Sequence, residues 1–208
     1  MSPITRRIRR APQIEPARSP LNILLLPGFL ASPVTMAYLG QQLARAGHSV
    51  SHWSLGFNLG ATPERIEAAE QQLSQLRESR QQPVTLIGWS LGGLFARELA
   101  KRGPEHVDKV ITLGSPFSGD PRANNAWRLY QFVAGHRVDQ PPIETVVNEK
   151  PPVETIAFWS PRDGVVAPRS ACGKPGERDR AVAVRCTHMG FSYSADAIEA
   201  LLRELLRE

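Results

Sequence analysis

The chain has 208 residues, of which 41% are hydrophobic and 22% are charged. These proportions are typical of one soluble globular domain, and no apolar run approaches the roughly 20 residues that cross a membrane. The first residues lack the apolar core of a secretory signal, so we expect a cytoplasmic protein. The two cysteines, Cys172 and Cys186, form no metal-binding motif. They would be free thiols in a reducing compartment and could pair in an oxidising one.

The formal net charge of +5 is concentrated near the start of the chain. Residues 1–20 hold five arginines against the single Glu15, which leaves a charge of only +1 for residues 21–208. Four prolines interrupt the same segment, so we expect a flexible, basic N-terminal tail. Weak contact with an anionic membrane surface is a second interpretation of this charge, whereas no motif indicates binding to nucleic acid.

After residue 20, short apolar runs alternate with amphipathic segments. The apolar runs are typical of strands buried on both faces, and the segments between them repeat apolar residues at helical spacing. This alternation predicts an α/β domain over residues 21–208, with three layers and a mostly parallel sheet of about six strands. We predict strands at 21–26, 48–55, 84–89, 109–114, 153–159 and 181–186, and helices at 36–46, 63–80, 91–101 and 195–207.

Residues 117–152 break this alternation and form a short insertion, which we call the cap. Prolines flank the cap, and its residues 125–134 form one amphipathic stretch in which Trp127 and Tyr130 share a helical face. Two interpretations remain open for this stretch, a lid that lines a substrate pocket and a helix packed on the core. Trp127 and Tyr130 are therefore candidate substrate-binding residues.

The sequence Gly88-Trp89-Ser90-Leu91-Gly92 lies between a predicted strand and a predicted helix. A serine that attacks a substrate must stand clear of the sheet on a tight turn, and small residues two positions before and after it relieve the crowding there. The N-terminus of the following helix also favours negative charge near the serine. The pattern predicts Ser90 as a nucleophile, with Trp89 packed beneath it.

A serine hydroxyl needs a neighbouring base, and the base needs an orienting partner. The loop after the fifth predicted strand contains Asp163, and the loop after the sixth contains His188. In a parallel sheet such loops gather at the carboxyl edge, where Ser90 also lies. The order of the three predicts a triad of Ser90, Asp163 and His188. Asp120, soon after the fourth strand, is the alternative acid, but the strand before Asp163 and the glycine after it favour Asp163.

Ester hydrolysis also needs two backbone N–H groups that bind the oxyanion. Leu91, directly after the serine, is one candidate donor. The second should come from the loop after the first strand, LPGFLASP. Gly28 lets that backbone approach closely, and Phe29 is the candidate donor.

These motifs resemble the α/β-hydrolase superfamily, on its lipase and esterase side. The resemblance covers about residues 21–206. Within the superfamily, the chain looks most similar to small bacterial hydrolases near the triacylglycerol-lipase and GPI inositol-deacylase-like groups. It implies Ser90 as nucleophile, Asp163 as acid and His188 as base, without a metal or an organic cofactor. The chain departs from larger members in its short cap and in lacking room for their first two strands. The matching pieces are LLLPGFLASP, LIGWSLGG, VITLGSPF, WSPRDGVV and CTHMGF.

The combined pattern predicts a carboxylic ester hydrolase that forms an acyl-enzyme on Ser90. The expected substrate is a small-molecule or lipid ester. Three alternatives remain open. An acyltransferase would use an alcohol in place of water, a phospholipid deacylase would be held at a membrane by the arginine-rich tail, and a non-catalytic relative would only bind its ligand.

Overall fold

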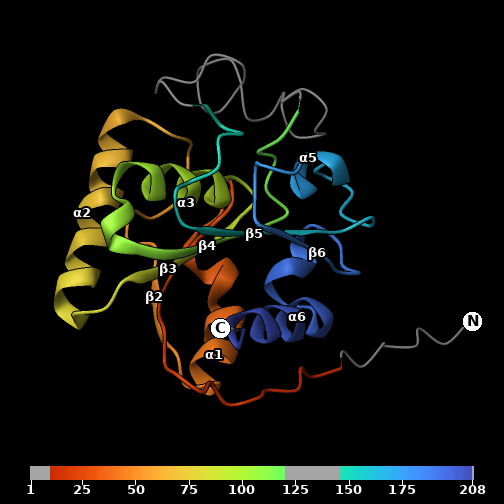
Figure 1. Cartoon of the computed structure of the whole chain (residues 1–208). Helices are drawn as coiled ribbons and strands as arrows, with labels where there is room; N and C mark the ends of the chain where they lie inside the picture. The colour runs from red at the N-terminus through yellow and green to blue at the C-terminus, as the bar shows by residue number, and fades with distance from the viewer. Residues whose placement is uncertain (1–9, 120–145, 208) are drawn as a thin grey trace, which may run out of the picture.

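A computed structural model describes residues 10–119 and 146–207 of the chain (Figure 1). Within them, the strands form an open six-stranded sheet in the order β2-β1-β3-β4-β5-β6, and every neighbouring pair is parallel. The predicted α/β architecture is therefore confirmed. The strands are β1 (Asn22–Leu26), β2 (Ser49–His52), β3 (Val84–Trp89), β4 (Val107–Leu113), β5 (Glu154–Trp159) and β6 (Arg180–Ala183).

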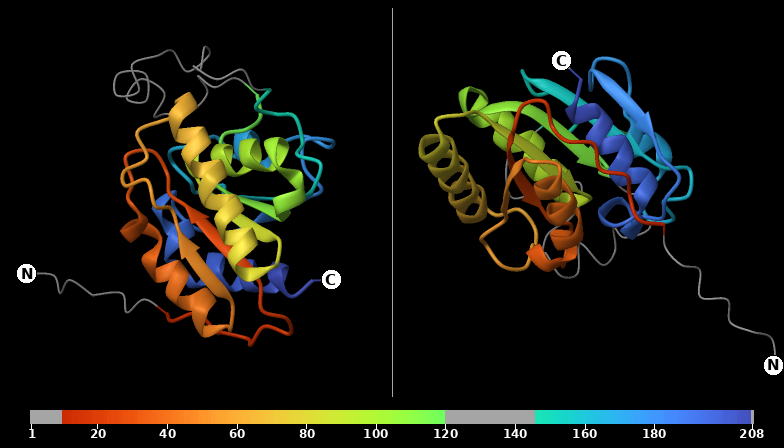
Figure 2. Two further views of the ribbon diagram at one scale, coloured as in Figure 1. Left: turned by 90° about the vertical axis from the view of Figure 1, so that its left-hand side faces the viewer. Right: turned by 90° about the horizontal axis from the view of Figure 1, so that it is seen from below.

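Helices cover both faces of the sheet (Figure 1, Figure 2). Helices α2 (Pro63–Arg80) and α3 (Leu91–Arg102) lie on one face, and α1 (Ala37–Arg45) and α6 (Ala195–Leu205) lie on the other. Successive residues of β1 alternate between the two cores, with Leu25 packed toward α1 and α6, and Leu24 toward α2 and α3. The described residues also form the short helix α5 (Pro168–Cys172) and the 3-10 turns Pro33–Met36, Pro104–His106 and Met189–Ser192.

The boundaries of the elements follow local signals closely where such signals exist. Thr62 caps α2 by accepting the N–H of Arg65 at 3.3 Å, and Pro63 occupies the first helical position. Ser194 caps α6 in the same way through the N–H of Ala197. Strand β6 ends three residues before its predicted end, and β2 is also shorter than predicted.

The described part of the predicted tail, residues 10–20, contains no helix or strand and is held against the domain. Arg10 donates a 2.8 Å hydrogen bond to Glu199 of α6, whose second carboxylate oxygen accepts the N–H of Gln13. The N–H of Ala17 donates to the carbonyl of Ala46 at 2.7 Å, and Ile14 packs against the core. Residues 1–9 lie outside the described residues.

None of the helices within residues 10–119 and 146–207 has the length and apolar character to cross a membrane.

The two described ends of the cap meet at a buried arginine of α3. The Arg97 guanidinium donates to the carbonyls of Glu149 at 2.9 Å and Glu177 at 3.1 Å, and it stacks 4.2 Å from the ring centroid of Phe117. Burial lowers the pKa of Arg97 to about 10, against the opposing charge of Glu177. Arg97 thus fixes the points where the chain leaves for residues 120–145 and returns from them.

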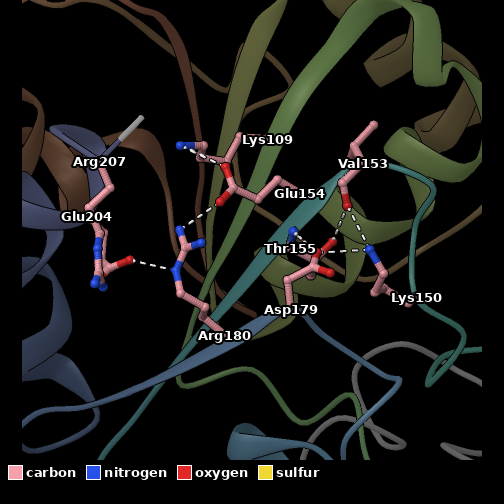
Figure 3. A network of polar contacts seen from close by, with 9 residues as sticks. All are labelled: Lys109, Lys150, Val153, Glu154, Thr155, Asp179, Arg180, Glu204 and Arg207. Carbon is pink, nitrogen blue, oxygen red and sulfur yellow. Dashed lines mark hydrogen bonds and ion pairs between the residues drawn. The ribbon is translucent and has the colours of Figure 1, made fainter.

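Charged side chains bridge the amino ends of β4, β5 and β6 (Figure 3). The carboxylate of Glu154 forms one ion pair with Lys109 at 2.9 Å and another with Arg180 at 2.6 Å. Arg180 also contacts Glu204 of α6, so the network ties three strands to one helix. Burial alone would raise the pKa of Glu154, but the hydrogen bonds and charges of Lys109 and Arg180 outweigh burial and lower it.

We expect Glu154→Gln to lower the free energy of unfolding by about 0.5–1 kcal/mol near neutral pH, because solvent screens this half-exposed network. A carboxylate whose folded-state pKa is lowered stabilises the fold above its unfolded pKa, and this stabilisation disappears as pH falls through the folded pKa. The difference from wild type should therefore stay constant from about pH 7 down to the unfolded pKa, about 4.3, and disappear below it. Urea unfolding at several pH values measures it.

The matched control is Glu67→Gln on α2. The carboxylate of Glu67 is exposed and forms no ion pair with the described residues. It removes the same charge, so an equal loss of stability there would contradict a specific role for Glu154.

Candidate active site

Ser90 occupies a strained turn between β3 and α3. Its backbone has φ 54° and ψ −120°, a left-handed conformation that a residue with a side chain rarely adopts. The turn is also crowded, because a Cβ atom at Gly88 would overlap the backbone of Gly92, and one at Gly92 would overlap the carbonyl of Leu26. The N–H of Ser90 donates to Leu113 at the end of β4 at 2.9 Å. The geometry presents the side chain of Ser90 beyond the sheet.

Asp163 and His188 come together beyond the carboxyl ends of β5 and β6. Oδ2 of Asp163 lies 2.9 Å from Nδ1 of His188, and both side chains are almost fully buried. Oδ1 of Asp163 accepts the N–H groups of Val165 at 2.9 Å and Val166 at 2.7 Å. A carboxylate only accepts hydrogen bonds, so Nδ1 of His188 carries the proton and Nε2 of the neutral ring keeps a lone pair.

The loop that carries His188 is fixed by its backbone. The His188 N–H donates to the carbonyl of Asp163 at 2.9 Å. Cys186, two residues before His188, is held by Ser160. The Ser160 hydroxyl donates to the carbonyl of Cys186 at 2.6 Å and accepts the N–H of Cys186 at 3.2 Å. Ser160 follows β5 directly, so it joins the loop of the acid to the loop of the base. Ser160 was not among the site residues predicted from the sequence, and its place at the end of a predicted strand was the only signal for it.

Cys172 and Cys186 are both free thiols in the structure. Burial, together with the nearby carboxylate of Asp163, raises the pKa of Cys186 to about 12. The thiol of Cys186 is therefore neutral at ordinary pH and is a poor nucleophile.

The loop after β1 packs directly on the turn of Ser90. A Cβ atom at Gly28 would lie 3.1 Å from Cβ of Ser90, closer than most real contacts of a Cβ atom, so a side chain there would press on the turn. Asn58, a fully buried residue that was not identified from the sequence, holds this loop in place. Its side-chain amide donates to the carbonyl of Pro27 at 2.8 Å, and its backbone carbonyl accepts the N–H of Leu30 at 2.8 Å. Phe29 follows Gly28 directly in this loop.

Leu91 begins α3, so its N–H belongs to the first turn, whose donors have no partner within the helix. The two candidate oxyanion donors thus come from segments that meet at Ser90.

The other candidates divide into two groups. Asp120, Trp127 and Tyr130 lie outside the described residues. The remaining described histidines, His48, His52 and His106, make no described contact with Ser90, Asp163 or His188: Nδ1 of His48 accepts the N–H of Leu21 at 3.2 Å, and burial lowers the pKa of His48 and of His52.

Large hydrophobic side chains are exposed on loops that follow the strands. Most of those exposed by the described residues lie on the loops after β1, β2 and β6 or at the returning end of the cap: Leu30, Val34, Phe57, Leu59, Val146 and Met189. The edge of the sheet that holds Ser90 is therefore bordered by apolar surface.

Two curated relatives share short parts of the sequence. The chain is 43% identical over 51 residues to a biotin biosynthesis bifunctional protein BioHC of Teredinibacter turnerae, and 32% identical over 81 residues to a pimeloyl-[acyl-carrier protein] methyl ester esterase of Nitrosospira multiformis. These matches cover 24% and 37% of this chain, but only 9% and 31% of the two relatives.

Solved structures show the same fold at low sequence identity. Lipase B of Aspergillus fumigatus matches with a TM-score of 0.69 and 17% identity, over 93% of this chain and 55% of that one. The lipase BlEst2 of Bacillus licheniformis matches with a TM-score of 0.68 and 14% identity, over 93% of this chain and 96% of that one. The type II thioesterase BorB of the borrelidin biosynthetic cluster matches with a TM-score of 0.60 and 19% identity, over 94% of this chain and 95% of that one.

A family model described as the alpha/beta hydrolase fold matches residues 22–140. The matched range is more than half of the chain and includes the loop after β1, the turn of Ser90 and strand β4. The open parallel sheet and the turn between β3 and α3 agree with that match. The chain belongs to the α/β-hydrolase family.

Proposed function

We propose that this protein hydrolyses carboxylic esters, with Ser90 as nucleophile, His188 as base and Asp163 as the acid that orients the base. One observation carries the proposal. A buried carboxylate and imidazole, 2.9 Å apart, lie at the same edge of the sheet as a serine held in a left-handed turn. Membership of the α/β-hydrolase family supports a hydrolase, and these residues give it the chemistry of acyl transfer.

The proposed reaction has two steps. The hydroxyl oxygen of Ser90 attacks the ester carbonyl while Nε2 of His188 takes its proton, and the N–H groups of Phe29 and Leu91 bind the oxyanion. The intermediate collapses to an acyl-serine, and the leaving alcohol takes the proton from His188. Water then attacks the acyl-serine with His188 as base, which releases the acid and restores the hydroxyl. Asp163 holds the imidazole and stabilises its charged form.

The apolar surface around the site favours substrates with an apolar acyl group. Leu30, Phe57 and Met189 each expose a third or more of their surface on loops beside the proposed triad. Methyl esters belong among the test substrates, because one curated relative is named for the methyl ester that it cleaves.

Fluorophosphonate labelling tests the proposal directly. We expect wild-type protein to take up one label, which mass spectrometry places on the peptide that contains Ser90. Ser90→Ala should take up none, and Ser79→Ala, which removes an exposed hydroxyl from α2, should label like wild type. Hydrolysis of p-nitrophenyl esters and methyl esters of rising chain length then measures the preferred acyl group.

Wild-type protein that neither takes up the label nor hydrolyses any ester would contradict the proposal. Product analysis with added alcohol separates hydrolysis from acyl transfer to the alcohol.

A further inference from the structure

The indole of Trp89 contacts three parts of the proposed site at once. It precedes Ser90 in the chain and is almost fully buried. Its Nε1–H donates to the backbone carbonyl of His188 at 3.0 Å, and its ring centroid lies 5.4 Å from that of the imidazole. On the side of the β1 loop, a Cβ atom at Gly28 would lie only 3.0 Å from the indole ring. The nucleophile turn, the base loop and the loop of the proposed oxyanion donor therefore meet on one side chain.

The base needs this support because it lies in an irregular segment after the edge strand. Within residues 10–119 and 146–207, strand β6 ends at Ala183 and pairs only with β5, so no sheet hydrogen bond from these residues reaches His188. Both backbone groups of His188 instead have partners from other elements: its N–H donates to Asp163, and its carbonyl accepts from Trp89. The first contact sets His188 relative to the acid, and the second sets it relative to the nucleophile.

We propose that Trp89 is a positioning residue, which fixes the distance between His188 and Ser90 through the hydrogen bond of its indole; the inference rests on the proposed function of this site. Trp89 and Ser90 share a peptide bond in a strained turn, so His188 cannot move away from Ser90 without breaking or bending this hydrogen bond. Removal of the indole N–H should therefore slow catalysis and leave substrate binding unchanged.

Trp53 offers a matched control within the same protein. It is as deeply buried as Trp89 and packs against Phe95 with ring centroids 5.2 Å apart. Among the described residues, its indole nitrogen has no hydrogen-bond partner. The same substitution at position 53 thus removes a buried N–H without removing a hydrogen bond, and it lies outside the proposed site.

The experiment replaces each tryptophan in the full chain with benzothienylalanine, an isostere whose sulfur takes the place of the N–H, and separately with phenylalanine. Fluorophosphonate titration counts the active sites, so that kcat is expressed per competent site and loss of folded protein does not enter it. We expect kcat per site to fall about tenfold for both replacements of Trp89, with KM within about twofold of wild type. The replacements of Trp53 should leave kcat per site unchanged.

An unchanged kcat per site in the benzothienylalanine variant at position 89, or an equal fall for the two tryptophans, would overturn the inference. A rise in KM with kcat unchanged would overturn it too, because Trp89 would then act on the substrate and not on His188. These outcomes differ from failure of the proposed function, in which wild-type protein itself takes up no label and hydrolyses no ester.

Discussion

Asp163→Asn should lower kcat for ester hydrolysis about ten-thousand-fold while the protein remains folded. An asparagine has only one acceptor oxygen, whereas both oxygens of Asp163 are used. If that oxygen accepts the N–H groups of Val165 and Val166, the amide NH2 faces Nδ1 of His188. The imidazole must then accept at Nδ1 and carry its proton on Nε2, so it cannot take the proton of Ser90.

Steady-state hydrolysis of a p-nitrophenyl ester, together with a thermal melt followed by circular dichroism, measures both parts of this expectation. Asp179→Asn is the matched control, because the Asp179 carboxylate accepts hydrogen bonds from Lys150 and from the N–H of Thr155 at the other edge of the sheet. It should retain wild-type kcat. If Asp163→Asn retained kcat and Asp120→Asn lost it, the alternative acid would be the correct one.

Gly92→Ala should lower the melting temperature by about 10 °C and kcat about a hundredfold. The added methyl group would overlap the carbonyl of Leu26 and lie 2.7 Å from that of Pro27. Both are backbone groups, so the helix that begins at Leu91 would have to move away from β1. Ser90 would move with it, and a small displacement of a nucleophile is costly for catalysis.

Gly93→Ala separates backbone crowding from side-chain crowding in the same turn. A Cβ atom at Gly93 would overlap the side chain of Ser115, and the nearest backbone atom, the carbonyl oxygen of Gly88, is 3.1 Å away. Ser115→Gly should therefore recover much of the stability lost in Gly93→Ala and recover nothing in Gly92→Ala. Melting temperatures of the single and double variants test this. Equal recovery in both backgrounds would show that the clash at Gly92 is not with the backbone.

The elements that the sequence predicted best are those whose signals are local. Strand β3 has the predicted bounds, 84–89, because its largely apolar run stops at Trp89, where the turn of Ser90 begins. Helix α2 begins at Pro63 and ends at Arg80 as predicted, because a capping threonine and a first-turn proline mark its start. Strand β6 was predicted at 181–186 but ends at Ala183, because its partner strand β5 ends at Trp159 and the N–H of Cys186 donates to the side chain of Ser160 instead of to a strand.

The site shows the same division. The meeting of Asp163 and His188 followed from one rule, that the carboxyl ends of parallel strands share an edge. The supports of the site did not follow from any local pattern. Asn58 binds the β1 loop from 31 residues further along the chain, and the indole of Trp89 reaches a carbonyl 99 residues away. Such contacts depend on the assembled fold, and they cannot be predicted from a single asparagine or tryptophan in the sequence.

The parallel sheet also separates two properties that protein engineers usually have to trade against each other. The ion pairs of Glu154 and Arg180 lie at the start of strands whose far ends lead to Asp163 and His188, and the six residues of β5 span roughly 17–20 Å. That distance exceeds both the Debye length at physiological salt and the range over which substitutions couple. Heat resistance can therefore be improved by redesigning charges at one edge, and substrate range altered at the other, with effects that add.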